Sequence, residues 1–322
     1  MAAFKYNKLF YYAKGYYHLL SSYRNHEKSA RKFLAENLKK YDEHYIVDRV
    51  NYYNRLLTVV HQNQFDVALE NFKKPQKPSA YFFDTIEYSR FFNSKYQLNF
   101  LYGDVISIPP VPTIVKTRPV LGANENSVLL NLDKNRHFRF IKDPKSFLTK
   151  KDKLIGRAVV SQPHRIAFYE KYFNHPLCDL GQVNPVGGKP EWLKPKISLN
   201  EHLNYKFVLA LEGNDVATNL KWILSSNSLA VMPLPKYESW FMEGKLLPDH
   251  HFIAIKEDYS DLEEKLEDYI SHPQKAEEMI RQAHLYIQPF QDKLLEKILS
   301  LLVLEKYFYV TGQSTTRTID YG

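Results

Sequence analysis

Cysteine is almost absent from this sequence of 322 residues, and long apolar runs are missing altogether. Cys178 is the only cysteine, so the chain cannot form an internal disulfide or a thiolate cage for a metal. No stretch reaches about 18 consecutive apolar residues, the length that a spanning helix needs. We therefore expect a protein of a reducing compartment that does not cross a membrane.

The sequence also lacks the common signatures of phosphate and metal sites. Neither a G-x-G-x-x-G stretch nor a G-x-x-x-x-G-K-[S/T] stretch occurs, which leaves the usual dinucleotide and P-loop sites without support. No two aspartates stand two positions apart, although metal-dependent sugar transferases commonly use such a pair. The 12 histidines form no group with ligand spacing, so we expect neither a metal nor a cofactor.

What the sequence does contain is enough apolar surface for a core, together with a basic surplus. Hydrophobic residues make up 44% of the chain and charged residues 25%. The net charge of +8 favours polyanions, which include nucleic acid, anionic lipid headgroups and phosphorylated glycans. Composition alone does not choose among these partners.

The first 20 residues are rich in aromatic side chains but are interrupted by Lys5, Lys8 and Lys14. They lack the apolar core and the cleavage site of a secretory signal. Helical spacing with little glycine or proline continues to about Leu69. Basic, aromatic helices suit the anionic face of a membrane, although an ordinary solvated helical face has the same pattern.

Two lobes are predicted, with the boundary near residue 150. Residues 1–150 should form an irregular lobe with a helical start, and residues 151–322 an α/β Rossmann-like lobe with C-terminal helices. The apolar run FVLAL at 207–211 is typical of a strand buried on both faces of a parallel sheet. Ser198-Leu-Asn-Glu201 and Ser260-Asp-Leu-Glu263 match capping boxes, and a long helical stretch follows from 274 to about 308.

The most informative segment is EGNDVATNLK at 212–221, where the apolar strand ends at a glycine and a helix begins. Backbone amides at a helix start suit a diphosphate, and Gly213 lets a ligand approach the backbone closely. Lys221 could add a positive charge. Ordinary strand-to-helix turns share these features, so the spacing alone leaves both interpretations open.

The ordered motifs from 205 to 266 resemble the core of glycosyltransferase family 90. They are a Tyr-Lys strand, a (D/E)GN turn, a Tyr-Glu-x-(W/F)-Phe stretch and a Lys-x-Asp-x-x-(D/N)-Leu helix start. Upstream, residues 150–165 resemble the family's Arg-Gly segment followed by Pro-x-Arg. Residues 103–120 and 126–143 resemble its bacterial branch, the lipopolysaccharide core transferases of the LpsA type. The match covers roughly residues 103–270.

This resemblance implies an α/β, GT-B-like fold of two Rossmann-like lobes, with a helical N-terminal region and a C-terminal helix that crosses back. Residues 1–150 would be the acceptor-side lobe, and residues 151–322 the lobe that binds the nucleotide-sugar donor. It implies an inverting, metal-independent transfer of a hexose from a UDP-sugar onto a lipopolysaccharide or lipooligosaccharide core. The donor is a substrate, and no cofactor is expected. The implied location is cytoplasmic, peripheral on the inner face of the cytoplasmic membrane, without nucleic acid as a partner.

The resemblance also implies which residues bind the donor. The two arginines would pair with phosphate or bracket the uridine, and the glutamate would lie near the ribose or the sugar. The family usually has arginine where this chain has Asn219, and Lys221 could replace that contact. The implied donor residues are Arg157, Arg165, Gly213, Asn214, Asp215, Val216, Ala217, Thr218, Asn219, Lys221 and Glu238.

An inverting transfer needs a carboxylate that deprotonates the acceptor hydroxyl. In the family this base comes from the N-terminal lobe, ahead of a segment that ends in Lys-Thr. Asp104 is the nearest acidic residue before Val115-Lys116-Thr117, so we expect it to be the base. Glu212 and Asp215 are reserve candidates, and Lys116, Arg118 and His137 are placed on the acceptor side.

Two other function classes remain open at this stage. A nucleic-acid-binding protein would also be basic and aromatic, but the charge is spread along the chain and no binding motif is recognised. A sugar-binding relative without catalytic activity would keep the fold, and the asparagine at 219 is compatible with one. Release of UDP from one donor would distinguish an enzyme from both.

Overall fold

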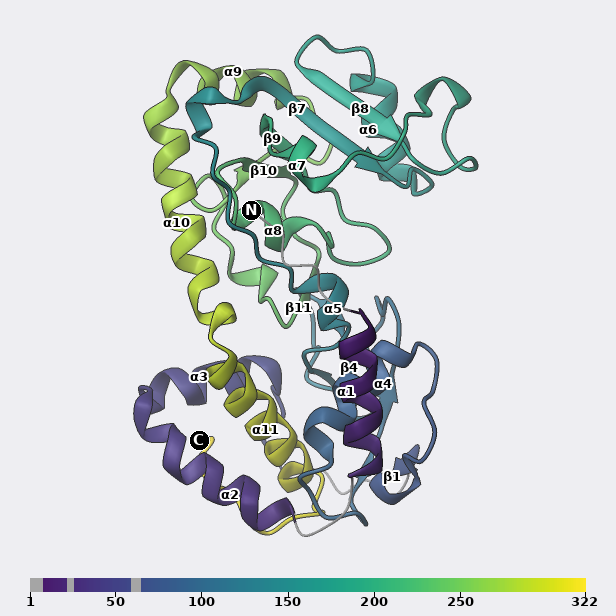
Figure 1. Ribbon diagram of the computed structural model, residues 1–322, viewed down its shortest axis with the longest axis vertical. Coiled ribbons are helices and arrows are strands. Elements are labelled where there is room, and N and C mark those ends of the chain that lie inside the picture. The colour runs from purple at the N-terminus through teal and green to yellow at the C-terminus, as the bar shows by residue number, and fades with distance from the viewer. Residues whose placement is uncertain (1–7, 22–25, 59–64) are drawn as a thin grey trace. The chain divides into compact units, whose positions relative to one another are not determined.

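The computed structural model describes residues 8–21, 26–58 and 65–322, which form two compact units (Figure 1). Unit 1 comprises Met1–His137, Lys236–Met242 and Pro289–Gly322, and unit 2 comprises Phe138–Pro235 and Glu243–Gln288. Two segments beyond residue 150 thus belong to unit 1. They do so because strand β11 (Tyr237–Ser239) pairs with β5 (Thr117–Pro119), and because α11 (Lys293–Val310) packs on helices α3 and α4.

Unit 2 is built on a parallel sheet of five strands in the order β12-β10-β9-β7-β8. Phe207 and Leu209 face one side of the sheet and Val208 faces the other, and all three are buried. The prediction of an α/β unit with this strand covered on both faces is therefore confirmed. The strands are β7 Lys151–Ala158, β8 Cys178–Gln182, β9 Tyr205–Leu209, β10 Leu229–Met232 and β12 Ile253–Ala254.

Helices of unit 2 supply the rest of its core. Phe168 of α6 and Leu262 and Leu266 of α9 pack in one cluster with Phe207 of the sheet, while α8 contacts β10. The helices are α6 Pro163–Tyr172, α7 Leu199–His202, α8 Leu220–Leu224, α9 Leu262–Ser271 and α10 Pro273–Gln291, of which the residues up to Gln288 belong to this unit. Short 3₁₀ turns lie at Phe147–Thr149, Pro190–Trp192 and Glu243–Lys245.

The strand order creates a topological switch point between β7 and β9. From β7 the chain moves to β8 on one side, and then returns to β9, β10 and β12 on the other side. In open parallel sheets, ligands bind in the crevice outside the carboxyl ends of the strands at such a point. The segments that leave β7 and β9, residues 159–162 and 210–219, begin at this edge.

The two predicted capping boxes have different outcomes. At the start of α7, the Ser198 hydroxyl accepts from the Glu201 amide at 3.2 Å, and a Glu201 carboxylate oxygen accepts from the Ser198 amide at 2.6 Å. This box is confirmed. The box at Ser260 was wrong, because α9 begins at Leu262 with Asp261 as the N-cap residue and without a side-chain cap.

Unit 1 contains three small sheets. One is a parallel sheet in the order β3-β4-β6, and the pairs β1-β2 and β5-β11 are antiparallel. Three short parallel strands do not by themselves make a Rossmann-like lobe, so the GT-B arrangement stays a prediction. The remaining strands are β1 Val67–Ala68, β2 Gln97–Leu98, β3 Phe100–Leu101, β4 Thr113–Val115 and β6 Ser127–Leu129.

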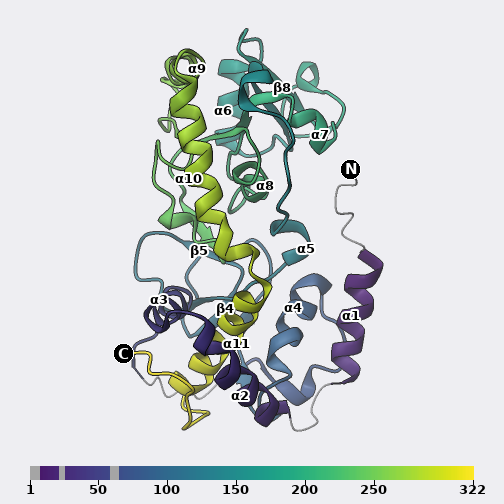
Figure 2. The ribbon, with the colours of Figure 1, turned by 60° about the vertical axis from the view of Figure 1, so that its left-hand side comes forward.

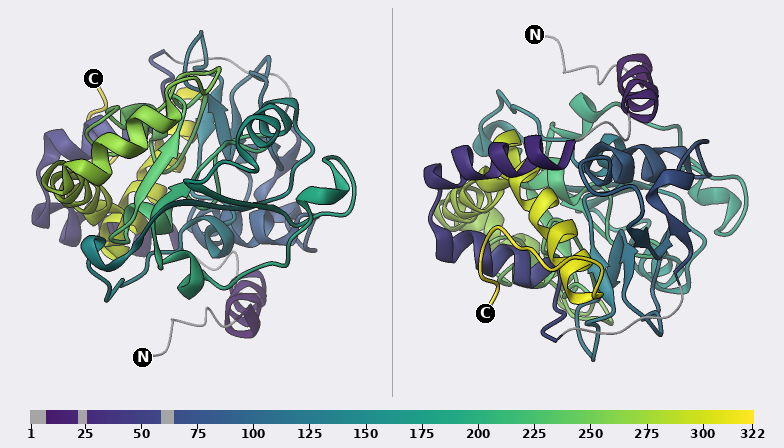
Figure 3. Two further views of the ribbon diagram at one scale, coloured as in Figure 1. Left: turned by 90° about the horizontal axis from the view of Figure 1, so that it is seen from above. Right: turned by 90° about the horizontal axis from the view of Figure 1, so that it is seen from below.

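Helices α2, α3 and α4 pack against α11, which Figure 3 (right) shows in yellow beside the purple helices α2 and α3. The helical stretch predicted from 274 to 308 is interrupted at Asp292, whose carboxylate accepts from the amides of Leu294 and Leu295 and starts α11. The other helices are α1 Lys8–Leu20, α2 His26–Asn37, α3 Glu43–Tyr53, α4 Ser79–Ser89 and α5 Lys134–His137, with 3₁₀ turns at Leu38–Lys40 and Leu69–Asn71.

A buried carboxylate ties α11 to the rest of unit 1. Glu296 accepts from Arg49 and Asn131, each at 3.2 Å, and from the Trp240 indole. Trp240 stacks on Tyr53 with ring centroids 3.7 Å apart. Burial raises the pKa of Glu296 to about 7, although Arg49 and Trp240 oppose the shift.

This raised pKa predicts a pH dependence of stability. Between about pH 4.5 and 7 the folded chain holds a proton on Glu296 that the unfolded chain has released, so the free energy of unfolding should fall as pH rises. One pKa unit corresponds to about 1.4 kcal/mol, which sets a loss of about 3 kcal/mol. Urea unfolding of Glu296→Gln should lack this slope. The exposed Glu277→Gln is the control, and equal slopes for the wild type and Glu296→Gln would refute the prediction.

In the part of the chain that the structure describes, no helix combines the length and the apolar character that crossing a bilayer requires.

Candidate active site

The guanidinium of Arg165 joins the two segments that leave the switch point. Its Nη1 donates to the carbonyl of Val159 after β7, and its Nη2 and Nε donate to the carbonyls of Leu211 and Glu212 after β9, all at 2.8 Å. The ring of His164 also contacts the Glu212 carbonyl at 2.8 Å. These contacts fix the turn after β9 against the first residues of α6.

The turn itself has an accessible side and an anchored side. Asn214 is exposed, Glu212 and Gly213 are half-buried, and Val216 and Ala217 are buried beneath them. A Cβ added to Gly213 would lie 3.4 Å from Arg165 Nη2. The turn and the guanidinium therefore lie together at the edge where a ligand of this sheet is expected.

The turn is closed by short-range contacts. The Gly213 amide donates to the Asp215 carbonyl at 2.9 Å, and the buried Asp215 lies among the anchored residues of the turn. Thr218 and Asn219 are half-buried at its far end, where the Asn219 side chain donates to the Leu209 carbonyl at 2.9 Å. The side chain at 219 thus fastens the turn to the end of β9.

The helix that faces this crevice is α6 and not the one expected from the sequence. Helix α8 spans only Leu220–Leu224, and Asn219 does not cap it with its side chain. Helix α6 has ten residues and follows β7 directly, so its positive end lies at the carboxyl edge of the sheet. Gln162, its N-cap residue, donates to the Asn214 side chain at 3.1 Å, which joins this helix start to the turn.

Lys221 occupies a different environment from the expected one. Its ammonium is fully buried and lies 2.5 Å from a carboxylate oxygen of Glu243, which is 2% exposed. The charge is balanced inside unit 2 and is not presented at the surface of the turn. The contact with a donor phosphate therefore stays a prediction, and the structure gives Lys221 a supporting position.

Arg157 is likewise engaged within the sheet. It donates to the carbonyl and the carboxylate of Asp179 at 2.7 and 2.9 Å, and Lys194 and Tyr205 bind the same carboxylate. Burial alone would raise the pKa of Asp179, but the hydrogen bonds from Tyr205, Arg157 and Lys194 lower it to about 2. The Nε of Arg157 is buried without a hydrogen-bond partner among the described residues. Its donor role stays a prediction.

The predicted base lies in unit 1, in the loop after β3. The carboxylate of Asp104 is 29% exposed and lies 2.7 Å from the ammonium of Lys116, which is 2% exposed. The Lys116 ammonium also lies 5.9 Å from the centroid of the Tyr81 ring on α4. A buried cation thus holds and orients a partly exposed carboxylate.

Glu238 belongs to unit 1 because β11 pairs with β5, where it stands directly opposite Arg118. Both side chains are fully buried, with Arg118 Nε 2.8 Å from the Glu238 carboxylate. Arg55 donates to the same carboxylate at 3.2 Å, and the Tyr52 hydroxyl binds it as well. The structure thus brings Glu238 together with two arginines, while its contact with a ribose or a sugar stays a prediction.

His137 ends helix α5 and is buried, with its ring 3.9 Å from the Asp133 carboxylate. Its place on the acceptor side stays a prediction. Within the described ranges, no three His, Cys, Asp or Glu side chains gather as metal ligands. Metal independence is likewise still a prediction, because it concerns the reaction.

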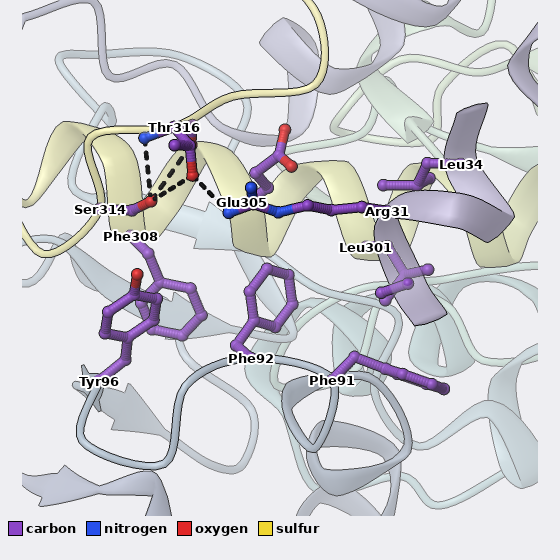
Figure 4. Close-up of a pocket in the computed structure, with 11 residues that line it drawn as sticks. Arg31, Leu34, Phe91, Phe92, Tyr96, Leu301, Glu305, Phe308, Ser314 and Thr316 are labelled. Atoms are coloured by element: carbon purple, nitrogen blue, oxygen red, sulfur yellow. Dashed lines mark hydrogen bonds between the residues drawn. The ribbon is translucent and has the colours of Figure 1, made fainter. Parts of the chain in front are cut away.

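A pocket in unit 1 near α2 and α11 is aromatic, and its rim carries the hydrogen bond from Arg31 to Thr316 (Figure 4). It encloses about 20 Å³, which is room for one water molecule and not for a sugar. A larger depression of about 410 Å³ in unit 2 is lined by Asp249, Lys265 and Asp268. Asp249 precedes β12, so this depression lies at the amino ends of the strands, away from the switch point.

Several partners of the site could not be read from the sequence. His164 and Gln162 contact the turn from the start of α6, Glu243 neutralises Lys221, and Asp179 holds Arg157. The Pro-x-Arg motif drew attention to residue 165, and its histidine is adjacent. The acidic partners stand outside any quoted motif, so no sequence signal identified them.

Known proteins resemble the chain in the region of this site. A model described as Glycosyl transferase family 90 matches residues 189–299, which include the turn after β9 and the whole of β10. The O-glucosyltransferase LpsA of Dichelobacter nodosus is 40% identical over 263 residues, which is 82% of each chain. The family predicted from the ordered motifs is thereby confirmed, and the chain belongs to glycosyltransferase family 90.

Proposed function

We propose that this glycosyltransferase moves a hexose from a UDP-sugar onto the core of a lipopolysaccharide or lipooligosaccharide, with inversion at the anomeric carbon and without a metal. Glucose is the first donor sugar to test, because the similar LpsA protein is described as an O-glucosyltransferase. In this proposal the chain has a GT-B-like arrangement, with the donor in unit 2.

The observation that carries the proposal is the set of hydrogen bonds that Arg165 makes at the switch point. Arg165 bridges the segments after β7 and β9, and the positive end of α6 lies at the same edge. A guanidinium and helix-start amides together offer the charge and the donors that a diphosphate requires. They would stabilise the leaving UDP electrostatically as the glycosidic bond to the donor breaks.

The acceptor hydroxyl needs a base, and we assign that role to Asp104. Its carboxylate would accept the hydroxyl proton while the oxygen attacks the anomeric carbon from the face opposite UDP. Lys116 holds and orients this carboxylate, so it is a positioning residue. The Glu238–Arg118 pair, being fully buried, would support the site from within unit 1.

The proposed acceptor is attached to lipid, so the protein should work at a membrane surface, peripheral on the inner face of the cytoplasmic membrane. The basic surplus of the chain supports this placement. We infer no nucleic-acid partner.

A panel of UDP-sugars scored by thermal unfolding tests the donor. A ligand that binds only the folded chain raises its melting temperature, and we expect UDP-glucose to do so without added divalent ions. Glucose transfer to a delipidated core oligosaccharide, with an anomeric assignment by NMR, then tests the reaction and its inversion. Protection by no UDP-sugar, or an absolute need for a divalent ion, would refute the proposal.

Gly213→Ala tests the donor turn more locally. The new methyl group would stand 3.4 Å from Arg165 Nη2, between the guanidinium and a bound phosphate. We expect about tenfold weaker UDP-sugar binding by calorimetry, a loss of about 1.4 kcal/mol, with little change in melting temperature. Gly244→Ala, in an exposed turn of the same unit, is the control. Unchanged affinity in Gly213→Ala would place the diphosphate elsewhere.

A further inference from the structure

Helix α1 of unit 1 exposes an apolar face. Leu9, Tyr16 and Leu20 follow one another at helical spacing and are 77%, 51% and 86% exposed. Phe10 and Tyr17 form a second row beside them, at 70% and 67% exposure. Exposed large apolar side chains are ordinary when scattered, but these five share one side of a single helix, at whose edge Tyr16 also packs against the Phe83 ring with centroids 5.0 Å apart.

The opposite face of α1 is fixed to the unit. A Cβ at Gly15 would lie 2.5 Å from the Phe83 ring, so α1 and α4 approach closely there. The Tyr11 hydroxyl donates to Asp84 at 2.9 Å, and Lys14 pairs with Glu87 at 2.7 Å. Figures 1 and 2 show α1 lying alongside α4. The helix is thus anchored by one face, while the apolar side chains named above are largely exposed.

The charge around α1 is positive. From residue 1 to residue 26 the sequence contains three lysines and one arginine, with no acidic residue. Burial lowers the pKa of His18 to about 4, and the positive charges of Arg90 after α4, Lys14 and Lys134 lower it further, while Glu87 opposes them. A basic, aromatic helix of this kind matches a surface that is apolar inside and anionic outside.

We propose that the exposed face of α1 docks unit 1 on a bilayer that carries anionic headgroups. Phe10, Tyr17 and Leu20 enter the boundary between headgroups and acyl chains, and the basic surplus of residues 1–26 attracts the chain to the anionic surface. This inference rests on the proposed function in one respect, because it names the surface for the membrane contact proposed there.

The same anchoring connects the docking face to the predicted base. Tyr11 also donates to the carbonyl of Ala80 at 3.0 Å, and the next residue, Tyr81, faces the Lys116 ammonium that holds Asp104. The face that binds the bilayer and the predicted base therefore belong to the same unit.

Vesicle flotation of the full chain tests the docking face. The vesicles contain phosphatidylcholine with about one-third phosphatidylglycerol, or phosphatidylcholine alone. The test variant is Phe10→Glu/Tyr17→Glu/Leu20→Glu. The control is Leu148→Glu/Leu247→Glu/Leu285→Glu, which changes the same charge at exposed leucines of unit 2. We expect the wild type and the control to float with the anionic vesicles, and the α1 variant to bind at least tenfold more weakly.

Equal flotation of the α1 variant and the wild type would overturn the inference, as would a wild type that ignores anionic vesicles. Light scattering covers the alternative that the face joins two copies of the chain. The inference would also be overturned if the wild type were a dimer that does not bind vesicles and the α1 variant were a monomer. Transfer to a delipidated acceptor should be the same in all three proteins. Its absence from all of them would count against the proposed function and leave the docking result intact.

Discussion

Replacement of Asp104 by asparagine should reduce kcat for sugar transfer by about a thousandfold, because general base catalysis contributes 10²–10⁴-fold. Asparagine has nearly the same shape but cannot take the proton of the acceptor hydroxyl. Its carbonyl oxygen can still accept from Lys116, which limits the disturbance to the buried ammonium. UDP-sugar binding, measured by calorimetry, should stay within about threefold of the wild type, since one tenfold change equals about 1.4 kcal/mol.

Asp48→Asn is the matched control, because Asp48 is exposed on α3 of the same unit. Its transfer rate should equal that of the wild type. A thousandfold loss of UDP-sugar binding in Asp104→Asn would show that the residue belongs to the donor site. Full activity would remove Asp104 as the base and turn attention to Glu212 and Asp215.

The second large effect concerns stability. Lys221→Ala breaks a buried ion pair, because it removes the ammonium that lies 2.5 Å from the Glu243 carboxylate, which is 2% exposed. Breaking such a pair costs about 3–5 kcal/mol. We expect a matching fall in the free energy of unfolding by urea, with donor affinity close to that of the wild type in the folded protein at low temperature.

The double variant Lys221→Met/Glu243→Leu tests whether the buried carboxylate charge that remains in Lys221→Ala causes the loss of stability. It removes both charges and should recover most of the lost stability. Lys265→Ala is the exposed control, since its pair with Asp249 is partly solvated and worth about 1 kcal/mol or less. A stable Lys221→Ala that binds UDP-sugars much more weakly would restore the direct phosphate contact and contradict the supporting role.

The sequence predicted the part of the fold that depends on local pattern. The run FVLAL predicted a strand covered on both faces, and Ser198 with Glu201 predicted the start of a helix. Both predictions were possible because each signal depends on only a few neighbouring residues. The break at Asp292 was missed, because heptad-like apolar spacing continues across it. Ser260 was misread because Asp261 provides the N-cap position one residue later.

The sequence predicted which backbone segment forms the candidate site, but it did not predict which partners its side chains contact. Spacing led to the turn at 212–221, and the Pro-x-Arg motif led to Arg165, which does contact that turn. The environments of Lys221 and Arg157 depend on Glu243 and Asp179, which are distant in the sequence. Glu238 lies in unit 1 because β11 pairs with β5, and pairing between remote strands leaves no local signal.

Amide hydrogen exchange with and without UDP tests the central claim most directly. If the turn after β9 and the start of α6 hold the diphosphate, UDP should slow exchange in peptides that cover residues 212–219 and 163–166. Uridine, which has no phosphate, should protect these peptides far less. Protection confined to other segments, or equal protection by uridine, would contradict the account.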